Sequence, residues 1–213
     1  MTDNIIFISG IGTNVGKSYA TGWLANMLAA QGKNVMTQKL IQTGNTDMSE
    51  DITVHRHIMH TGYNEYDQRH ITSPVILSYP ASPHLAAAID HISIDFAKIN
   101  NATETLASIF DVVLVEGAGG LMVPLTKTYL TIDYIQDRHY PVALVTNGSL
   151  GSINHTLLSF EALAAHNIPL RYVIYNPFFD EDPVIAADNK EFMREYFSAH
   201  SQSTQFLVMP QTL

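Results

Sequence analysis

The chain has 213 residues, 46% of them hydrophobic and 15% charged, which suits one domain with a sizeable core better than two. Its 20 acidic and 11 basic residues give a formal net charge of −9, which argues against nucleic-acid or anionic-membrane binding. Cysteine is absent, which excludes disulfides and thiolate metal sites, and we expect a single domain over residues 1–213.

Two features bear on cellular location. No apolar run reaches the roughly 18 residues that a membrane span needs. The opening residues MTDNIIFISG lack the basic region of a secretion signal. We therefore expect a cytoplasmic protein that binds neither membranes nor nucleic acid.

Predicted strands and helices alternate along the chain. The apolar run at residues 4–9 predicts a buried strand, and the apolar spacing of residues 17–30 predicts an amphipathic helix. Further strands are expected at residues 34–40, 112–115, 142–145, 172–175 and 206–209, and helices at about 95–109, 152–166 and 184–198. This alternation predicts a three-layer α/β fold, with a mostly parallel central sheet and helices on both faces. Residues 44–75 are polar and weakly patterned, so we expect loops and short helices there, over the sheet edges.

The segment FISGIGTNVGKS, residues 7–18, predicts a phosphate-binding loop between the first strand and the first helix. In such a loop, backbone N–H groups and the helix N-terminus attract phosphate, a lysine meets the terminal phosphates, and a hydroxyl reaches Mg²⁺. Gly16, Lys17 and Ser18 fit these roles, although five residues, one more than usual, separate Gly10 from Gly16. The alternative, a glycine turn with a surface lysine, fits the strand–loop–helix context poorly.

Two further strand ends carry charged residues. In DVVLVEGAGG, residues 111–120, a buried strand leads to Glu116 and then to a predicted glycine turn. Ligands of open α/β sheets bind at the carboxyl ends of the strands, where a carboxylate can hold Mg²⁺. Lys39 lies near the end of the second strand, and we expect it to face the phosphates, with snorkelling to solvent as the alternative.

The cluster of His55, His57 and His60 suggests a metal site at first sight. At helical spacing, however, His57 and His60 share a face that excludes His55. The sequence shows no further ligand nearby, so we interpret these histidines as part of a solvated helix face.

Taken together, the motifs resemble those of the dethiobiotin synthetase family. The resemblance covers residues 5–176 and rests on motifs in the family's order and spacing. They are Gly10-x₅-Gly16-Lys17-Ser18, Lys39 with Thr43-Gly44, Asp51, Ser82-Pro83-His84, Glu116-Gly117-Ala118-Gly119-Gly120 and Leu150-Gly151-Ser152-Ile153-Asn154-His155. The loop alone would be unspecific, whereas the set is not.

The resemblance implies a P-loop NTPase-like fold and a cyclo-ligase, a ligase that forms C–N bonds. It would use ATP and Mg²⁺ to carboxylate 7,8-diaminononanoate with CO₂ and close the ring of dethiobiotin, releasing ADP and phosphate. The route would pass through a carbamate and a carbamic-phosphoric anhydride. Members of the family are homodimers.

The resemblance also assigns residues to roles. It implies that Lys17 and Lys39 are catalytic. The implied Mg²⁺ ligands are Ser18, Asp51 and Glu116. The implied ATP site comprises Thr13, Asn14, Val15, Gly16, Lys17, Ser18, Asp51, Glu116, Gly117, Ala118, Gly119, Asn176, Pro210 and Gln211. The implied substrate site comprises Thr13, Lys39, Thr43, Gly119, Gly151 and Asn154, with the Gly151–Asn154 helix start binding the substrate carboxylate at the dimer interface.

Three other classes of protein remain as alternatives. Partitioning-ATPase switches share this sheet, but they carry an extra lysine in the first half of the loop, and Gly10–Val15 contains none. Amidotransferase-like synthetases carry a glutaminase domain with a nucleophilic cysteine, which this sequence lacks. A purely structural protein would leave the charged strand ends without a role.

Overall fold

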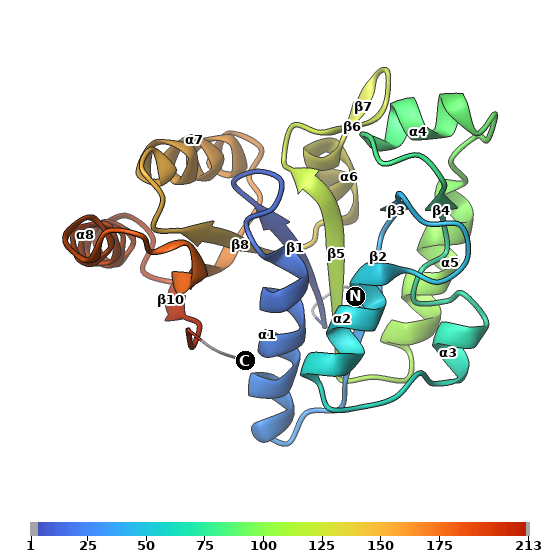
Figure 1. Ribbon diagram of the computed structural model, residues 1–213, viewed down its shortest axis with the longest axis horizontal. Helices are drawn as coiled ribbons and strands as arrows, with labels where there is room; N and C mark the ends of the chain where they lie inside the picture. Colours follow the sequence, from blue (N-terminus) through green and yellow to red (C-terminus); the bar gives the residue numbers. More distant parts are fainter. Residues whose placement is uncertain (1–3, 212–213) are drawn as a thin grey trace.

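The computed structural model describes residues 4–211 and shows an α/β fold around one parallel six-stranded sheet (Figure 1). The strand order is β10-β9-β8-β1-β5-β2, and every neighbouring pair is parallel. These strands are β1 (Ile5–Gly10), β2 (Val35–Lys39), β5 (Val112–Gly120), β8 (Val142–Asn147), β9 (Leu170–Asn176) and β10 (Gln205–Val208). Two small pairs flank the sheet: β3 (Gln42–Thr43) with β4 (Ile76–Leu77), and β6 (Pro124–Thr126) with β7 (Tyr129–Leu130).

Helices connect the strands. They are α1 (Lys17–Ala30), α2 (Glu50–Ile58), α3 (Glu65–Gln68), α4 (Pro83–Ile89), α5 (Phe96–Ala107), α6 (Thr131–Arg138), α7 (Ser152–Ala165) and α8 (Pro183–His200), with a short 3₁₀ turn η1 (Pro177–Phe179) after β9. Within residues 4–211, every helix is too short or too polar to cross a lipid bilayer.

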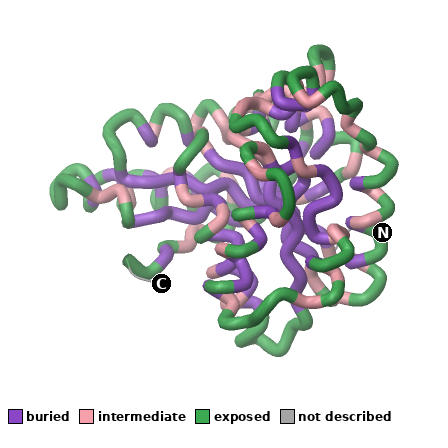
Figure 2. The backbone as a smooth tube through the Cα atoms, turned by 45° about the vertical axis from the view of Figure 1, so that its right-hand side comes forward, coloured by how far each residue is buried: buried purple, intermediate pink, exposed green. Residues whose placement is uncertain are grey.

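The two faces of the sheet bury different sets of side chains. Along β1, Ile6 and Ile8 join the apolar cluster that includes Leu24 of α1. Ile5 and Phe7 point the other way, into a larger cluster that includes side chains from α5, α6, α7 and α8. Figure 2 shows the buried strands at the centre and exposed segments around them. The predicted three-layer arrangement is therefore confirmed.

The predicted strands and helices are present, with one informative difference at β5. The sequence suggested a strand that stops before Glu116 and a glycine turn after it, whereas the strand continues to Gly120. A Cβ at Gly117 would lie only 2.8 Å from the Phe7 ring, so glycine permits a close approach between β5 and β1. Glu116 consequently lies within β5, paired with Lys39 at the end of β2 and with Ile8 of β1.

The weakly patterned segment at residues 44–75 contains α2 and α3, beside the edge strand β2. A buried ion pair holds this segment: both Arg56 Nε and Nη2 donate to the Asp67 carboxylate at 2.8 Å. Arg56 also donates to Thr37 Oγ1 of β2 at 2.8 Å, and Thr72 donates to Asp67 at 2.7 Å. Burial alone would raise the pKa of Asp67, but the hydrogen bonds from Arg56 and Thr72 outweigh it and hold that pKa below its usual value.

We expect Asp67→Asn to lower the free energy of unfolding at pH 7 by about 3 kcal/mol, because it leaves the buried Arg56 charge unpaired. Since the folded-state pKa of Asp67 is depressed, its stabilisation is complete well above the ordinary value of 3.8 and is lost as the pH falls through the lower folded-state value. The difference between wild type and variant should therefore shrink in acid. Denaturant unfolding at several pH values measures both effects.

The matched control is Glu191→Gln, which breaks the exposed pair of Glu191 with Arg194 on α8. We expect a change below about 0.5 kcal/mol there. Equal losses in the two variants would show that the buried pair stabilises the fold no more than a surface pair does.

Candidate functional site

Most of the predicted site residues converge at the carboxyl ends of β1, β2 and β9, where β5 extends beyond β2. One cavity of about 650 Å³ lies there. The predicted residues that line it are Thr13, Asn14, Gly16, Lys17, Ser18, Lys39, Thr43, Asp51, Glu116, Ala118, Gly119, Asn176, Pro210 and Gln211. Tyr19, Ile41, Gln42, Phe178, Phe179 and Met209 also line the cavity.

The loop before α1 has the geometry of an anion site. Gly16 has φ +88° and precedes the helix, and a side chain there would clash with the Asn176 amide. The first turn of α1 carries no acidic residue, so its free N–H groups and the helix dipole favour a negative ligand. Lys17 Nζ donates to the Gly12 carbonyl at 2.9 Å, which places the ammonium group across the same loop.

Lys17 is buried, with 7% of its surface exposed. Burial lowers the pKa of its ammonium group to about 8, with the Lys39 charge acting in the same direction and the Glu116 charge opposing it. A cation that has lost most of its hydration binds a phosphate oxygen more strongly than a hydrated one, since the local dielectric is low.

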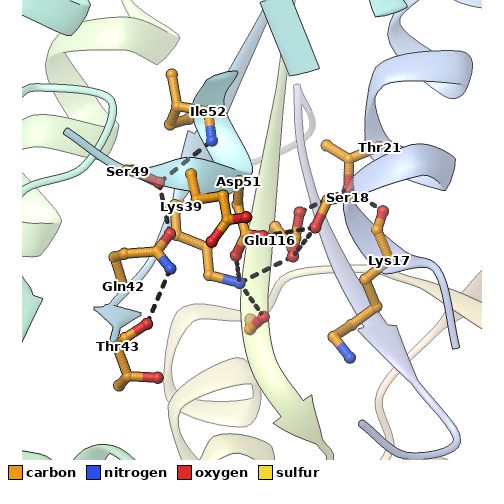
Figure 3. A network of polar contacts seen from close by, with 12 residues as sticks. Lys17, Ser18, Thr21, Lys39, Gln42, Thr43, Ser49, Asp51, Ile52 and Glu116 are labelled. Carbon is orange, nitrogen blue, oxygen red and sulfur yellow. Dashed lines mark hydrogen bonds and ion pairs between the residues drawn. The ribbon is translucent and has the colours of Figure 1, made fainter. Parts of the chain in front are cut away.

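Glu116 is the centre of a buried polar network (Figure 3). Its Oε1 accepts from Lys39 Nζ at 2.8 Å and from Ser18 Oγ at 3.1 Å. Its Oε2 lies 2.7 Å from His55 Nε2 and 3.3 Å from Thr21 Oγ1. Only 1% of Glu116 is exposed, so these neighbours replace the water that a carboxylate otherwise requires.

Lys39 joins the two carboxylates of the site. Its Nζ lies 2.5 Å from Asp51 Oδ2, and it also donates to the Gly117 carbonyl at 3.0 Å. Burial opposes the charge of Lys39, but Glu116 and Asp51 outweigh that effect and raise its pKa. In turn, burial would raise the pKa of Glu116, yet the Lys39 charge and the His55 contact hold that pKa well below its usual range. Both groups are therefore ionised at neutral pH. Lys39 is buried and lines the cavity, so it does not reach out to solvent, while its contact with phosphate stays a prediction.

The oxygen atoms of Ser18, Asp51 and Glu116 form the donor set that a hard divalent cation uses. The Ser18 hydroxyl has two carboxylate acceptors, Asp51 Oδ1 at 2.8 Å and Glu116 Oε1 at 3.1 Å. Across residues 4–211, no three His, Cys, Asp or Glu side chains form a metal centre by themselves. A set of two carboxylates and one hydroxyl fits Mg²⁺, which takes its other ligands from water and phosphates.

The interpretation of His55 as part of a solvated face is wrong. His57 and His60 are exposed, but His55 is fully buried and contacts Glu116. The sequence held one usable signal: His55 follows Asp51 by four residues, so both lie on one face of α2. This spacing does not show which way the face points; the packing of α2 places it toward β5.

Four predicted site residues lie outside the cavity lining. The Val15 side chain packs in the core, and Gly117 contributes its carbonyl to Lys39. Gly151 and Asn154, at the start of α7, are exposed and do not line the cavity of this chain. Their assignment to the substrate stays a prediction that requires a second subunit.

Asn176, at the end of β9, contacts the phosphate loop at Val15 and Gly16. Its Nδ2 donates to the Val15 carbonyl at 3.1 Å, and its Oδ1 accepts from Phe178 N–H at 3.1 Å. These bonds fix the orientation of the amide while leaving one N–H and one lone pair for a ligand. The neighbouring Phe178 and Phe179 add aromatic surface to this end of the cavity.

Comparisons with known proteins identify the family of the chain. A family model described as an AAA domain matches residues 4–205. The ATP-dependent dethiobiotin synthetase BioD 2 of Pasteurella multocida (strain Pm70) is 45% identical over 205 residues, covering 96% of each chain. The ATP-dependent dethiobiotin synthetase BioD of Chlorobaculum tepidum is 46% identical over 191 residues, which cover 90% of this chain and 80% of that protein.

Among solved structures, a putative plasmid partition protein from Borrelia burgdorferi B31 bound to AMPPNP matches with a TM-score of 0.57 and 14% identity. The match covers 98% of this chain and 87% of that one. FlhF complexed with GMPPNP/Mg²⁺ matches with a TM-score of 0.52 and 13% identity, over 99% of this chain and 67% of that one. At such identities the likeness shows the fold alone.

The fold and the loop thus define a P-loop nucleotide-binding α/β protein. Sequence identity of 45% over nearly the whole chain narrows that class. The chain belongs to the family of ATP-dependent dethiobiotin synthetases.

If Lys17 stabilises the charge that develops on the transferring phosphoryl group, as the family resemblance implies, Lys17→Ala should reduce ATP-dependent turnover by about 10²–10³-fold. Steady-state phosphate release by the purified variant measures the loss, with circular dichroism to verify folding. Lys33→Ala, an exposed lysine just beyond α1, is the matched control and should retain wild-type turnover. More than half of the wild-type activity in Lys17→Ala would contradict the assignment of the loop.

Proposed function

We propose that this protein is an ATP-dependent dethiobiotin synthetase of biotin biosynthesis. Its reaction would be the carboxylation and ring closure of 7,8-diaminononanoate, with ATP converted to ADP and phosphate. The observation that carries the proposal is the meeting of the phosphate loop with the Lys39–Asp51–Glu116 cluster in one cavity. Membership of the dethiobiotin synthetase family supports the choice of substrate.

The chemistry divides into three balanced steps. One amine of the substrate attacks CO₂ and loses a proton, which gives a carbamate. A carbamate oxygen then attacks the γ-phosphorus of ATP, ADP leaves, and a carbamic-phosphoric anhydride forms. The second amine attacks the anhydride carbon and loses a proton, phosphate leaves, and the ring closes. Each step creates or moves negative charge on carbamate or phosphoryl oxygens, so the chief task of the protein is positioning and charge stabilisation.

The two buried lysines suit that task. Lys17 spans the phosphate loop, where it would hold the transferring phosphoryl group. Lys39 stands on the other side of the Ser18–Glu116 contact, where its ammonium group would meet the carbamate. Both cations are buried, so their attraction for the anionic groups of the reaction is screened less than it would be in water.

We assign Mg²⁺ to the oxygen atoms of Ser18, Asp51 and Glu116. When bound, Mg²⁺ would neutralise charge on the phosphate oxygens of ATP. The distances that support this assignment are those of Ser18 Oγ to Asp51, 2.8 Å, and to Glu116, 3.1 Å.

The remaining assignments follow the cavity from the phosphates outward. Asn14, Asn176, Pro210 and Gln211 line the cavity, and we place the adenine beside Asn176, Pro210 and Gln211. Thr13, Thr43 and Gly119 line the part where we place the diamine. For the substrate carboxylate we propose Gly151 and Asn154 of a partner subunit, because they are exposed here and a homodimer would bring them to the cavity. We place the reaction in the cytoplasm, with small molecules as its partners.

The direct test follows dethiobiotin and phosphate together, in an assay with the diamine, bicarbonate, Mg²⁺ and ATP. We expect phosphate release that depends on the diamine and equals ring closure in amount. ATP hydrolysis without any effect of the diamine would contradict the proposal and would instead favour a nucleotide-dependent switch. Asn101→Ala, on the exposed part of α5, provides a control for surface substitution and should leave both products unchanged.

We expect Asn154→Ala to raise the KM for the diamine by about tenfold, since a hydrogen bond to a carboxylate contributes about 1.5–3 kcal/mol. The KM for ATP should change less than twofold, because the phosphate loop lies in a different part of the site. Initial rates at varied diamine and at varied ATP separate the two. An unchanged diamine KM in a confirmed dimer would remove Asn154 from the substrate site.

A further inference from the structure

We propose that His55 is a positioning residue for the cation site. It would hold Glu116 Oε2 so that Oε1 faces Ser18 and Asp51. The proposal rests on the Mg²⁺ assignment made above, but not on the identity of the diamine substrate. It explains why a histidine is fully buried beside Glu116.

The geometry points to an oriented hydrogen bond. His55 Nε2 lies 2.7 Å from Glu116 Oε2, and the two side chains expose 0% and 1% of their surface. The other carboxylate oxygen, Oε1, takes the contacts with Ser18 and Lys39. The two oxygens of Glu116 therefore have separate partners, one toward α2 and one toward the cavity.

The direction of the hydrogen bond follows from the partners. An ionised carboxylate can only accept, so His55 Nε2 carries the proton and donates. Within residues 4–211, His55 Nδ1 is buried without a hydrogen-bond partner, so Nε2 is the ring nitrogen that contacts the protein. Thr21 Oγ1, the other neighbour of Oε2, donates to the Lys17 carbonyl at 2.8 Å, closer than its 3.3 Å approach to Glu116. His55 is thus the main donor to Oε2.

The backbone explains why the histidine reaches the site. Asp51 and His55 are one helical turn apart on α2, where Asp51 contacts Lys39 and His55 contacts Glu116 (Figure 3 shows Asp51 beside Lys39 and Glu116). Packing fixes α2, since Gly22 of α1 leaves room for Ile58. Partners behind a metal ligand fix its orientation, and their loss commonly reduces metal affinity 10–100-fold.

A simple packing role makes a different prediction. If His55 only fills space, leucine would replace it without consequence for the cation, because the two side chains have similar volume. If it orients Glu116, glutamine would replace it, because its Nε2 can donate from about the same place. Asparagine is polar but too short to reach Glu116 Oε2. It therefore distinguishes the effect of the hydrogen bond from the effect of any polar side chain at this position.

The experiment is calorimetric titration with AMPPNP, in Mg²⁺ and again in EDTA. We expect His55→Leu and His55→Asn to weaken binding at least tenfold in Mg²⁺ and less than twofold in EDTA. His55→Gln should stay within about threefold of wild type in both buffers. His57→Leu, on the same helix but exposed, is the matched control and should bind like wild type. Glu116→Gln should reproduce the metal-dependent loss.

Three results would overturn the proposal. The first is wild-type binding of Mg²⁺-AMPPNP by both His55→Leu and His55→Asn. The second is an equal loss of affinity with and without Mg²⁺, and the third is a His55→Gln variant that binds as poorly as His55→Leu. Either of the last two would indicate that His55 contributes by packing alone. Thermal unfolding identifies a variant that fails to fold. If His55→Leu does not fold, the comparison of His55→Gln with His55→Asn still distinguishes an orienting hydrogen bond from a packing role. If the wild-type protein binds Mg²⁺-AMPPNP but does not form dethiobiotin, the proposed function is wrong, whereas the positioning role of His55 is unaffected.

Discussion

The ion pair between Glu116 and Lys39 is the constraint on which the site depends. Burial of a carboxylate in the middle of a parallel sheet costs several kcal/mol unless charge and hydrogen bonds compensate for it. Lys39, at the end of the neighbouring strand, supplies the charge at 2.8 Å, and Ser18 and His55 supply hydrogen bonds. Each partner comes from a different element, so the pair ties β5, β2, α1 and α2 to a single point.

The phosphate loop is held between this pair and the end of β9. On one side Ser18, the second residue of α1, contacts Glu116. On the other side Asn176 donates to the Val15 carbonyl and lies against Gly16. The loop is therefore shaped by contacts with strands that lie apart in the sheet order, β5 and β9. A loop fixed in this way presents its N–H groups to an anion at little further cost in conformational entropy.

Helix α2 brings two side chains to Glu116 and Lys39 from a segment with little apolar pattern. The buried pair of Arg56 with Asp67 stabilises the turn that follows the helix, and Arg56 also bonds to Thr37 of β2. The opposite side of the same helix carries Asp51 and His55 toward Glu116. The nine residues of α2 thus include Arg56, which anchors the helix, and also Asp51 and His55, which contact Lys39 and Glu116. By anchoring the helix, Arg56 helps to fix the position of Asp51 and His55.

Sequence alone determined the order of the main elements, the phosphate loop and the family. Apolar periodicity and glycine chemistry are local properties, so β1, α1 and the Gly16–Ser18 motif could be predicted correctly from neighbouring residues. Tertiary structure alone decided how far β5 extends and where His55 points. The extension depends on the approach of Gly117 to Phe7, and the burial of His55 depends on the packing of α2 against α1. Both are contacts between segments distant in sequence, which no local pattern encodes.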